Sequence, residues 1–476
     1  MSKMYIGYPQ ASLAKEPGSE TITKQALWGD WCEVLEENLP YVKIRCRGAE
    51  GWVKKTAIQS EQILEINFVD VGQGDGCFIV TPDDKFILID AGEGDNMYHF
   101  LNWRFNLRYN TKTIPIEHLI ISHSDTDHYK GFGRIVNSSR FEIQHIHHNG
   151  IIERKASSIF GPVQDNYLMD IRTNREQIYE LLKISSNRGD KFFPNLLFDA
   201  MEKSASMKMS MLEKGSTILG YGPTDKVHFN ILGPVTEQSQ GKKVLRVLGS
   251  PGETKNGHSV IVQLKIGNAK ILLGGDLNDA SEEYLTEHYT GYSAHGLNEI
   301  EREDMIKKGR AVFESDVLKS CHHGSHKFMD DFLSFFNPIA TIISSGDNET
   351  HTHPRPDTLG AIGKHSRGKR PLIFSTELAR SAKEKLNITD KDYAQLYLLN
   401  ESKKAASPDE LIAINEKINN LRYKIERTIA VYGMITVRTD GKKILIAQKK
   451  EAKDAGFIYY ELLLDTEGKF YFKQPK

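Results

Sequence analysis

The sequence predicts an α/β fold preceded by a small all-β region, and three observations support this. From residue 63 onward, short runs rich in β-branched residues alternate with helical segments, which is typical of α/β architecture. Before that point only short β-rich pieces occur, separated by turn residues. The length of 476 residues corresponds to about three domains, or to two with insertions. We therefore expect a small domain over residues 1–60 and a large one over residues 61–476.

Composition and charge exclude several classes of protein. The chain carries 62 Lys and Arg against 63 Asp and Glu, a formal net charge of −1, so bulk positive charge cannot supply affinity for nucleic acid. A nuclease whose positive side chains are confined to the path that its substrate takes is still compatible with this net charge. No apolar run reaches the roughly 18 residues of a membrane span, and the N-terminus lacks the pattern of a secretion signal. The four cysteines show no CxxC spacing. We expect a cytoplasmic protein without membrane contact.

The first 60 residues contain β-rich pieces at Trp31–Leu35, Tyr41–Arg45 and Gly51–Val53. With Gly29 and the Gly51-Trp52-Val53 ending, this stretch resembles a bacterial SH3-like domain. The resemblance implies a module that contacts a protein partner. The alternative is a β-barrel that only packs on the following domain.

The large domain is expected to begin with strands and to include an insertion. A helix is predicted from Asp127 onward, and residues 148–226 are polar and irregular, with amphipathic pieces at Arg175–Ile184 and Leu196–Leu212. We interpret 148–226 as an insertion. The runs that predict strands are Ile63–Val69, Cys77–Val80, Phe86–Ile89, Ile116–Ile121, Phe141–Ile146, Val227–Leu232, Ser259–Ile266, Lys270–Leu273, Val317–Ser320 and Ala340–Ile343.

The C-terminal part combines a long helical segment with a hairpin. Residues 386–428 contain no glycine, and their apolar positions recur at helical spacing, which favours packing over partner recognition. Gly433–Val437 and Lys443–Ile446 flank a Thr439-Asp440-Gly441 turn, the pattern of a β-hairpin.

The string His123-Ser-Asp125-Thr-Asp127-His128 carries the clearest chemistry. It follows an apolar strand directly, and burying unpaired carboxylates and imidazoles costs roughly several kcal/mol each, so a purely structural role for all four side chains is unfavourable. Imidazole nitrogen together with carboxylate oxygen suits zinc, manganese or iron. The string therefore predicts a metal site.

Further candidate ligands lie directly before or after strands predicted later in the sequence. His258 precedes a strand, and Asp276 ends a strand at Gly274-Gly275. His322 and His323 follow the strand Val317–Ser320. Because α/β sheets place functional groups at the ends of strands, we expect these side chains to meet the first string at one edge.

Together these strings resemble the metallo-β-lactamase-fold hydrolases, in particular the branch related to the C-terminal domain of the ComEC DNA-uptake protein. The resemblance covers about residues 64–375 and the hairpin Gly433–Ile446. It implies a four-layer αββα sandwich with metal ions at one edge of its two sheets. The matching strings are Val69–Asp75, Leu88–Gly92, His123–His128, Leu273–Asp276, Leu318–Ser325 and Ser345–Asn348 with His353-Pro354.

The resemblance also implies two divalent metal ions, zinc or manganese, and a set of ligands for them. His323 in place of His322 remains an alternative, and Asp125 stands where the family's commoner form has histidine, which favours manganese beside zinc. Asp75 and Asp90 would orient the ligands. The implied ligands are His123, Asp125 and His258 for one ion, Asp127, His128 and His322 for the other, and Asp276 between them.

The function implied is a metal-dependent phosphodiesterase, specifically a nuclease that cleaves DNA or RNA with a hydroxide activated by two metal ions. Asp127 would orient that hydroxide, and His353 would donate to a phosphate oxygen or protonate the leaving group. The run Lys364–Arg370 supplies Arg367, Lys369 and Arg370 as candidate contacts to the phosphate backbone, or forms a solvated surface. Two alternatives stay open: a hydrolase of a small ester, lactone or nucleotide, and an interaction protein built on the SH3-like module.

Overall fold

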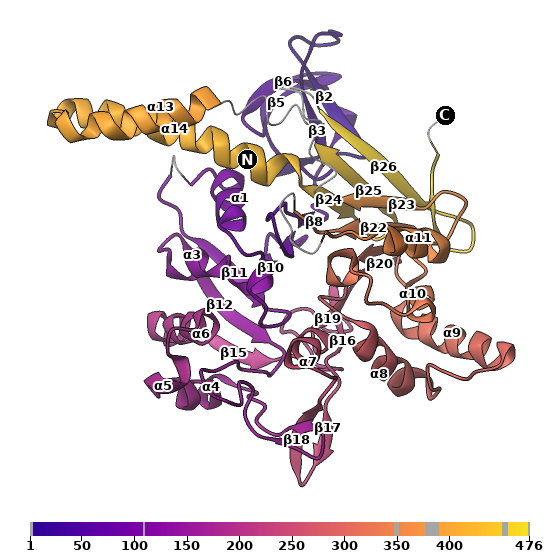
Figure 1. Ribbon diagram of the computed structural model, residues 1–476. Helices are drawn as coiled ribbons and strands as arrows, with labels where there is room; N and C mark the ends of the chain where they lie inside the picture. Colours follow the sequence, from indigo (N-terminus) through magenta and orange to yellow (C-terminus); the bar gives the residue numbers. More distant parts are fainter. Residues whose placement is uncertain (1–2, 108–109, 347–351, 377–389, 450–455, 475–476) are drawn as a thin grey trace.

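The computed structural model describes residues 3–107, 110–346, 352–376, 390–449 and 456–474. Part of the motif Ser345–Asn348 and the start of the segment 386–428 lie outside these residues. In the described part of the chain, two large sheets face each other, and their apolar faces form one core that includes Ile66 and Ile87 from one sheet and Val262, Ile271 and Ile342 from the other (Figure 1).

The first sheet has the order β15-β12-β11-β10-β9-β8-β24-β25-β26-β27. Strands β10, β11, β12 and β15 are parallel, so their carboxyl ends lie at one edge. The hairpin predicted around the Thr439-Asp440-Gly441 turn is present as β24 and β25. The strands are β8 (Leu64–Phe68), β9 (Gly76–Val80), β10 (Phe86–Ala91), β11 (Ile114–Ile120), β12 (Phe141–His148), β15 (Lys208–Met211), β24 (Ile435–Thr439), β25 (Lys443–Lys449), β26 (Phe457–Leu464) and β27 (Phe470–Phe472).

The second sheet has the order β16-β19-β20-β21-β22-β23, and its strands from β20 to β23 are parallel. The strands predicted from the sequence in both sheets are present, with ends shifted by at most three residues. The strands are β16 (His228–Gly233), β19 (Ile261–Ile266), β20 (Ala269–Leu273), β21 (Val317–Lys319), β22 (Ala340–Ile343) and β23 (Leu372–Ser375).

Helices cover the outer faces of both sheets. On the first sheet, Phe100, Phe132 and Leu197 pack with strand residues such as Leu119 in one apolar cluster. On the second sheet, a separate cluster joins Leu272 to residues of four helices. The order helix, sheet, sheet, helix is the mixed α/β sandwich predicted. The helices are α1 (Asn96–Arg104), α2 (Thr126–Tyr129), α3 (Phe132–Asn137), α4 (Arg175–Leu182), α5 (Ser185–Arg188), α6 (Phe192–Lys203), α7 (Pro251–Gly257), α8 (Asp279–Thr290), α9 (Glu299–Phe313), α10 (Asp330–Phe336) and α11 (Pro356–His365).

The segment 148–226 contributes to the main sheet. It contains α4, α5, α6 and a small hairpin of β13 (Val163–Gln164) and β14 (Tyr167–Leu168), and its strand β15 pairs in parallel with β12. The hairpin joins β18 (Lys242–Arg246) and β17 (Glu237–Ser239) in a four-stranded sheet.

The long helical segment predicted as one unit forms two helices, α13 (Asp390–Ser402) and α14 (Pro408–Tyr432). Figure 1 shows them side by side, projecting beyond the sandwich. None of the helices in the described ranges combines the length and hydropathy that crossing a bilayer requires.

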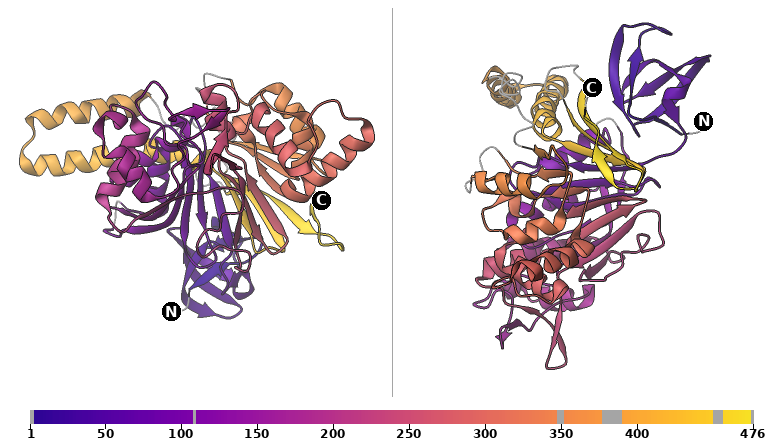
Figure 2. Two further views of the ribbon diagram at one scale, coloured as in Figure 1. Left: turned by 90° about the horizontal axis from the view of Figure 1, so that it is seen from below. Right: turned by 90° about the vertical axis from the view of Figure 1, so that its right-hand side faces the viewer.

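The N-terminal region is all-β, as predicted. Its strands form one seven-stranded sheet with the order β3-β2-β6-β5-β4-β1-β7 around the buried residues Ile6, Val42, Ile44 and Val53. Figure 2 shows this region at one end of the molecule, next to the C-terminal strands of the first sheet. The strands are β1 (Met4–Ile6), β2 (Gln10–Ala14), β3 (Ile22–Leu27), β4 (Trp31–Asn38), β5 (Tyr41–Cys46), β6 (Ala49–Lys54) and β7 (Ile58–Gln59).

Candidate metal centre

Five side chains meet where strands of both sheets end, and we call His123, Asp127, His128, Asp276 and His323 the centre. The first three follow β11, Asp276 follows β20, and His323 follows β21. Tight backbone turns bring these segments together. At Gly275, with φ +56°, an added Cβ would lie 2.5 Å from the Cβ of Ser259, so only glycine lets the chain pass there.

Three ligand atoms converge within the centre. His128 Nε2 lies 3.2 Å from Asp276 Oδ2 and 3.3 Å from His323 Nε2, and His323 Nε2 lies 3.3 Å from Asp276 Oδ2. Asp127 Oδ2 lies 3.5 Å from His323 Nε2. Four overlapping groups among the described residues have the spacing to hold a metal ion: His123, His128 and Asp276; Asp127, His128 and His323; Asp75, Asp276 and His323; and Asp75, Asp90 and His128.

The donor atoms of the centre fit divalent metal ions. Among the described residues, His123 Nε2 and Asp276 Oδ1 are buried and lack a hydrogen-bond partner. A buried polar atom left in this way costs about 1–3 kcal/mol, a cost that ligation would remove. Imidazole nitrogens and carboxylate oxygens are also the ligands that zinc and manganese take in proteins.

Neighbouring acceptors fix the orientation of two histidines. Asp90 Oδ2 accepts a hydrogen bond from His128 Nδ1 at 2.9 Å, and its Oδ1 accepts one from the backbone N–H of Ser122 at 2.8 Å. The carbonyl of Ser344 accepts from His323 Nδ1 at 3.0 Å. Because the Nδ1 atoms donate outward, both Nε2 atoms face the centre, where they would bind a metal ion once deprotonated. Asp90 thus has the position expected for a residue that orients a ligand.

The charges in the centre shift the pKa values in opposite directions. Burial alone would lower the pKa of His128, but the carboxylates of Asp276 and Asp90 outweigh it and raise that pKa well above its ordinary value. The pKa of His323 is raised in the same way by Asp276 and Asp75. Burial would raise the pKa of Asp127, but His323 and His128 outweigh it and lower that pKa. The carboxylates of the centre thus stabilise positive charge on the neighbouring imidazoles. A bound metal cation would be stabilised by the same carboxylates.

Asp125 contacts a lysine that the sequence analysis did not identify. Lys255 Nζ, from α7, forms an ion pair with Asp125 Oδ1, and the side-chain amide of Asn256 contacts Oδ2 at 2.6 Å. Burial would raise the pKa of Asp125, but His123 and Lys255 outweigh it and lower it to about 2. Asp125 Oδ2 lies 3.6 Å from His123 Nε2. The structure thus places Asp125 beside the centre and outside the groups that have the spacing to hold a metal ion.

Asp75 contacts a second unpredicted lysine. Lys319, on β21, is buried and forms an ion pair with Asp75 Oδ2, and its Nζ donates to the carbonyl of Gly275 at 3.2 Å. Asp75 Oδ1 lies 3.3 Å from His323 Nδ1. Burial would lower the pKa of Lys319, but Asp75 and Asp276 outweigh it and raise that pKa. Lys319 is therefore a charged ammonium at the edge of the centre. Lys319 lies within the string Leu318–Ser325 that matches the family, and this position could have marked it in the sequence as a site residue.

Two expected ligands lie differently from the prediction. His322 Nε2 is 3.9 Å from Asp276 Oδ2, farther than His323 Nε2, so the structure favours His323, the alternative to His322. Both residues have left-handed backbone, φ 46° and 52°, and this turn directs the second histidine inward. His258 is buried outside the converging groups, with its Nε2 donating to the carbonyl of Arg246 at 2.7 Å. Burial lowers the pKa of His258 to about 4.

The remaining predicted site residues divide into a near and a far set. The ring of His353 lies 5.9 Å from that of His322 and 6.3 Å from that of His323, so it borders the centre. Arg367 forms an ion pair with the buried Asp316. Lys369 and Arg370 line a cavity of about 270 Å³ with Phe470 to Phe472, ahead of β23.

Arg367, Lys369 and Arg370, the candidate contacts to the phosphate backbone, do not lie beside the centre. The centre lies at the carboxyl ends of parallel strands, and these residues precede the amino end of β23, which is parallel to β22. They therefore lie at the opposite edge of the second sheet.

A family model and individual proteins match this chain. The model described as the Metallo-beta-lactamase superfamily matches residues 72–315. "ComE operon protein 3" of Bacillus subtilis (strain 168) is 22% identical over 318 residues, which are 63% of this chain and 31% of that protein. The chain thus spans about a third of the length of that curated relative.

Two solved structures share little sequence with the chain. A protein from Parabacteroides distasonis ATCC 8503 described as a metal-dependent hydrolase is 10% identical, with a TM-score of 0.29 over 73% of this chain and 98% of the other. MEM-A1, a subclass B3 metallo-beta-lactamase from a soil metagenome library, is 12% identical, with a TM-score of 0.26 over 55% and 78%. Because the family model covers just over half of its residues, the chain belongs to the metallo-beta-lactamase superfamily of metal-dependent hydrolases.

Proposed function

We propose that this protein is a metal-dependent phosphodiesterase, and that its substrate is DNA or RNA. The overlap of the ligand groups is the observation that carries the proposal. His123 and Asp276 form one group with His128, and Asp127 and His323 form another group with it. Pairs of adjacent metal ions are a recurring device of nucleases and phosphatases. The motif resemblance to the ComEC branch and the match to "ComE operon protein 3" support a nucleic-acid substrate.

The residues around the centre have separate tasks in this proposal. When bound, divalent ions lower the pKa of a coordinated water and stabilise negative charge that develops on the ester. Asp90 and the carbonyl of Ser344 hold His128 and His323 in the ligand orientation. His353 lies at the border of the centre, where an imidazole can donate a proton to a leaving oxygen. Lys319 holds Asp75 in place as a charged pair.

One observation favours the alternative, a hydrolase of small esters, lactones or nucleotides. The basic run Lys364–Arg370 lies at the far edge of the sheet. Among the described residues, the two lysines that contact the site, Lys255 and Lys319, are both paired with carboxylates. A polynucleotide gains affinity from cations that contact flanking phosphates, whereas a compact substrate needs none.

One assay panel separates the two candidates. Purified protein loaded with zinc or with manganese is incubated with linear DNA, circular DNA, RNA, a chromogenic phosphodiester, an ester and a lactone. The proposal expects cleavage of a polynucleotide and of the chromogenic phosphodiester, and loss of both in Asp276→Asn. Hydrolysis of the ester or the lactone with no phosphodiesterase activity would replace the proposal with the alternative. Comparison of the two metals identifies the working ion.

The N-terminal sheet supports a separate proposal, that it is an SH3-like module which contacts a protein partner. Trp31 is 50% exposed and Leu39 is 68% exposed. Aromatic side chains such as tryptophan are enriched in protein–protein interfaces. Trp31→Ala is expected to change the proteins that co-purify with the chain and to leave hydrolysis intact. An unchanged set of partners would favour the alternative that the sheet only packs on the large domain.

A further inference from the structure

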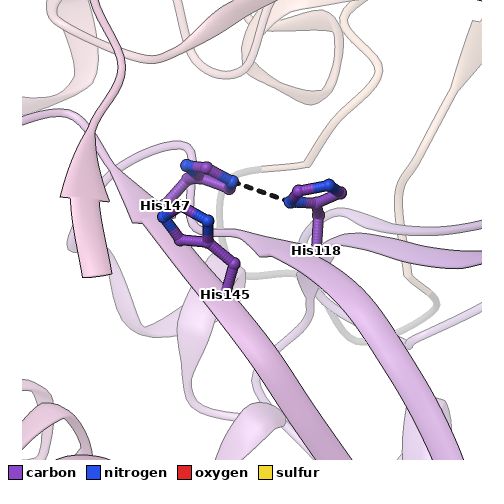
Figure 3. A group of neighbouring side chains, drawn as sticks. All are labelled: His118, His145 and His147. Carbon is purple, nitrogen blue, oxygen red and sulfur yellow. Dashed lines mark hydrogen bonds between the residues drawn. The ribbon is translucent and has the colours of Figure 1, made fainter. Parts of the chain in front are cut away.

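Three histidines outside the centre gather on neighbouring strands of the first sheet. His118 lies on β11, and His145 and His147 lie on β12. His118 pairs directly with His145 across the two strands, and His145 and His147 are two residues apart. Because side chains of a strand alternate between its faces, all three project to the same side (Figure 3). We call these residues the histidine triad.

The spacing within the triad suits ligation of a metal ion. His118 Nδ1 lies 3.0 Å from His147 Nε2. One nitrogen from each of the three residues lies within 4.8 Å of the other two. Zinc–nitrogen bonds of about 2.0–2.1 Å in tetrahedral geometry require nitrogens separated by about 3.3 Å. Movements of side chains by a few tenths of an ångström for the closest pair, and somewhat more for the third, would meet that requirement.

The opposite nitrogen of each ring is held by a neighbour. His118 Nε2 donates to the carbonyl of Leu219 at 3.2 Å. The hydroxyl of Ser210, on β15, lies 2.9 Å from His145 Nε2 and 3.0 Å from His147 Nδ1. Metal-binding histidines are oriented in this way by hydrogen bonds to the ring nitrogen that does not ligate. The nitrogens left for a cation are His118 Nδ1, His147 Nε2 and His145 Nδ1.

The surroundings keep the three imidazoles neutral, which is the form that ligates. His118 and His147 are buried, and His145 is half-buried, so the triad has one partly accessible member. Burial lowers the pKa of all three and brings that of His145 to about 4. The ring of Tyr221 packs against His118, with 5.6 Å between the ring centroids.

We propose that His118, His145 and His147 form a further metal site, separate from the centre, which binds one divalent transition-metal ion such as Zn²⁺. Three imidazoles without a carboxylate favour zinc, cobalt, nickel or copper over manganese or magnesium. A bound ion would join β11 to β12 and, through Ser210, to β15. The site would thereby fasten a strand of the 148–226 segment to the main sheet.

The test compares metal uptake by the full-length wild-type protein and three variants. His147→Gln removes a ligand, Ser210→Ala removes only the holding hydroxyl, and His228→Gln is the control, a half-buried histidine on β16 outside the triad and the centre. Each protein is stripped of metal and dialysed against Zn²⁺, and the zinc bound per chain is measured by elemental analysis. The visible absorption of Co²⁺ reports the geometry in parallel.

We expect wild type and His228→Gln to bind one more ion per chain than His147→Gln does. Ser210→Ala is expected to bind that ion about 10–100-fold more weakly. Circular dichroism checks the fold, and Ser210→Ala remains informative if His147→Gln does not fold. Equal uptake by wild type and His147→Gln would overturn the proposal. If only Ser210→Ala can be measured, an affinity equal to wild type would overturn it.

Discussion

At the scale of single residues, the adjacent histidines His322 and His323 differ in their relation to the centre. His323 Nε2 lies within 3.5 Å of both Asp276 and Asp127, and its ring is held by the Ser344 carbonyl. We expect His323→Ala to lower kcat/KM for the best substrate of the panel by more than about 100-fold, with loss of bound metal. His322→Ala should keep its metal and lose less activity. The reverse ranking would restore His322 as the ligand.

Asp90 offers a second prediction, because it holds the ring of His128 through Nδ1, whereas Nε2 of that ring faces Asp276 and His323. Asp90→Asn keeps the shape of the side chain but weakens the acceptor, and asparagine tolerates the φ of 56° found there. We expect metal affinity about 10–100-fold lower than in wild type. Asp84→Asn is the matched control, with a similar φ of 59° and a surface ion pair to Lys3. Equal affinities in both variants would mean that Asp90 only shapes the turn.

What the sequence predicts about single residues depends on how local the signal is. His123, Asp127 and His128 fall within six residues, and Asp276 ends a visible strand, so their grouping was predictable. The ion pair between Asp125 and Lys255 was not predictable, because 130 positions separate the two residues and only folding brings α7 next to the loop of Asp125. The choice between His322 and His323 depends on a left-handed turn that the sequence does not specify.

At the scale of elements, helix α8 carries a buried carboxyl group, Glu282. Its Oε2 accepts a hydrogen bond from the backbone N–H of Met329 at 2.5 Å, and burial raises its pKa to about 8. In unfolded chains the pKa of glutamate is about 4.3. A raised pKa in the folded state means that the stabilisation is complete below about pH 4 and is lost as the pH rises through about 8.

We therefore predict that the free energy of unfolding falls by roughly 2–3 kcal/mol between pH 6 and pH 9 in wild type, and that Glu282→Gln removes this fall. Urea denaturation at the two pH values measures it. The neighbouring Glu283, which contacts His295 at the surface, provides the control variant Glu283→Gln. If the free energy of unfolding of Glu282→Gln still falls between pH 6 and pH 9, the pH dependence belongs to other groups.

Two element-scale expectations were wrong for physical reasons. The apolar positions of the segment 386–428 follow one continuous helical period, but a second helix begins at Pro408. The backbone N–H and the hydroxyl of Ser407 both donate to the Glu410 carboxylate, and Pro408 occupies the first turn of α14, which are features of a helix N-terminus. The basic run follows His353 closely in sequence, but α11 intervenes. A helix of ten residues carries the chain about 15 Å, which moves Arg367 to the far edge.

At the scale of the whole molecule, the N-terminal sheet and the large domain share a buried interface. Leu27 and Trp28 pack with Ile63, Leu445 and Ala447 in one apolar cluster. Beside it, a network of buried charges crosses the boundary. The sequence predicted the all-β region and the hairpin that contains Arg438. It did not predict that the two pack together, because the contacting residues lie about 400 positions apart in the chain.

The network is centred on Asp30 of the N-terminal sheet and Arg438 of β24. Arg438 Nη1 lies 2.8 Å from Asp30 Oδ1 and donates to the carbonyl of Trp28 at 2.6 Å, and Arg47 also pairs with Asp30. Burial would raise the pKa of Asp30, but Arg438 and Arg47 outweigh it and lower that pKa. A lowered pKa contributes stability that is present above about pH 4, the value for unfolded chains, and is lost as the pH falls further.

This interface determines what a chain that starts at Ser60 would do. The centre takes no described residue from before position 60, so activity per folded molecule should match the full chain on a small chromogenic substrate. The truncation would, however, expose Leu445 and Ala447 and leave Arg438 without Asp30. We therefore expect a shortened chain that retains turnover but unfolds at a lower urea concentration. A soluble, metal-loaded shortened chain without activity would place the N-terminal sheet within the catalytic unit.

The single substitution Asp30→Asn tests the same coupling in the full chain. It removes the carboxylate that lies nearest to the buried Arg438 and the partly exposed Arg47, and leaves both with only longer contacts to Glu65. Breaking a buried ion pair in this way costs about 3–5 kcal/mol. Glu33→Gln is the control, because Glu33 pairs with the half-exposed Arg45 at the surface and such pairs contribute about 0–1 kcal/mol. Urea denaturation should therefore separate the two variants by several kcal/mol at pH 7, and the difference should begin to narrow only as the pH falls below about 4, the pKa of Asp in unfolded chains. Equal stabilities at pH 7 would show that the apolar cluster around Trp28 alone holds the two parts together.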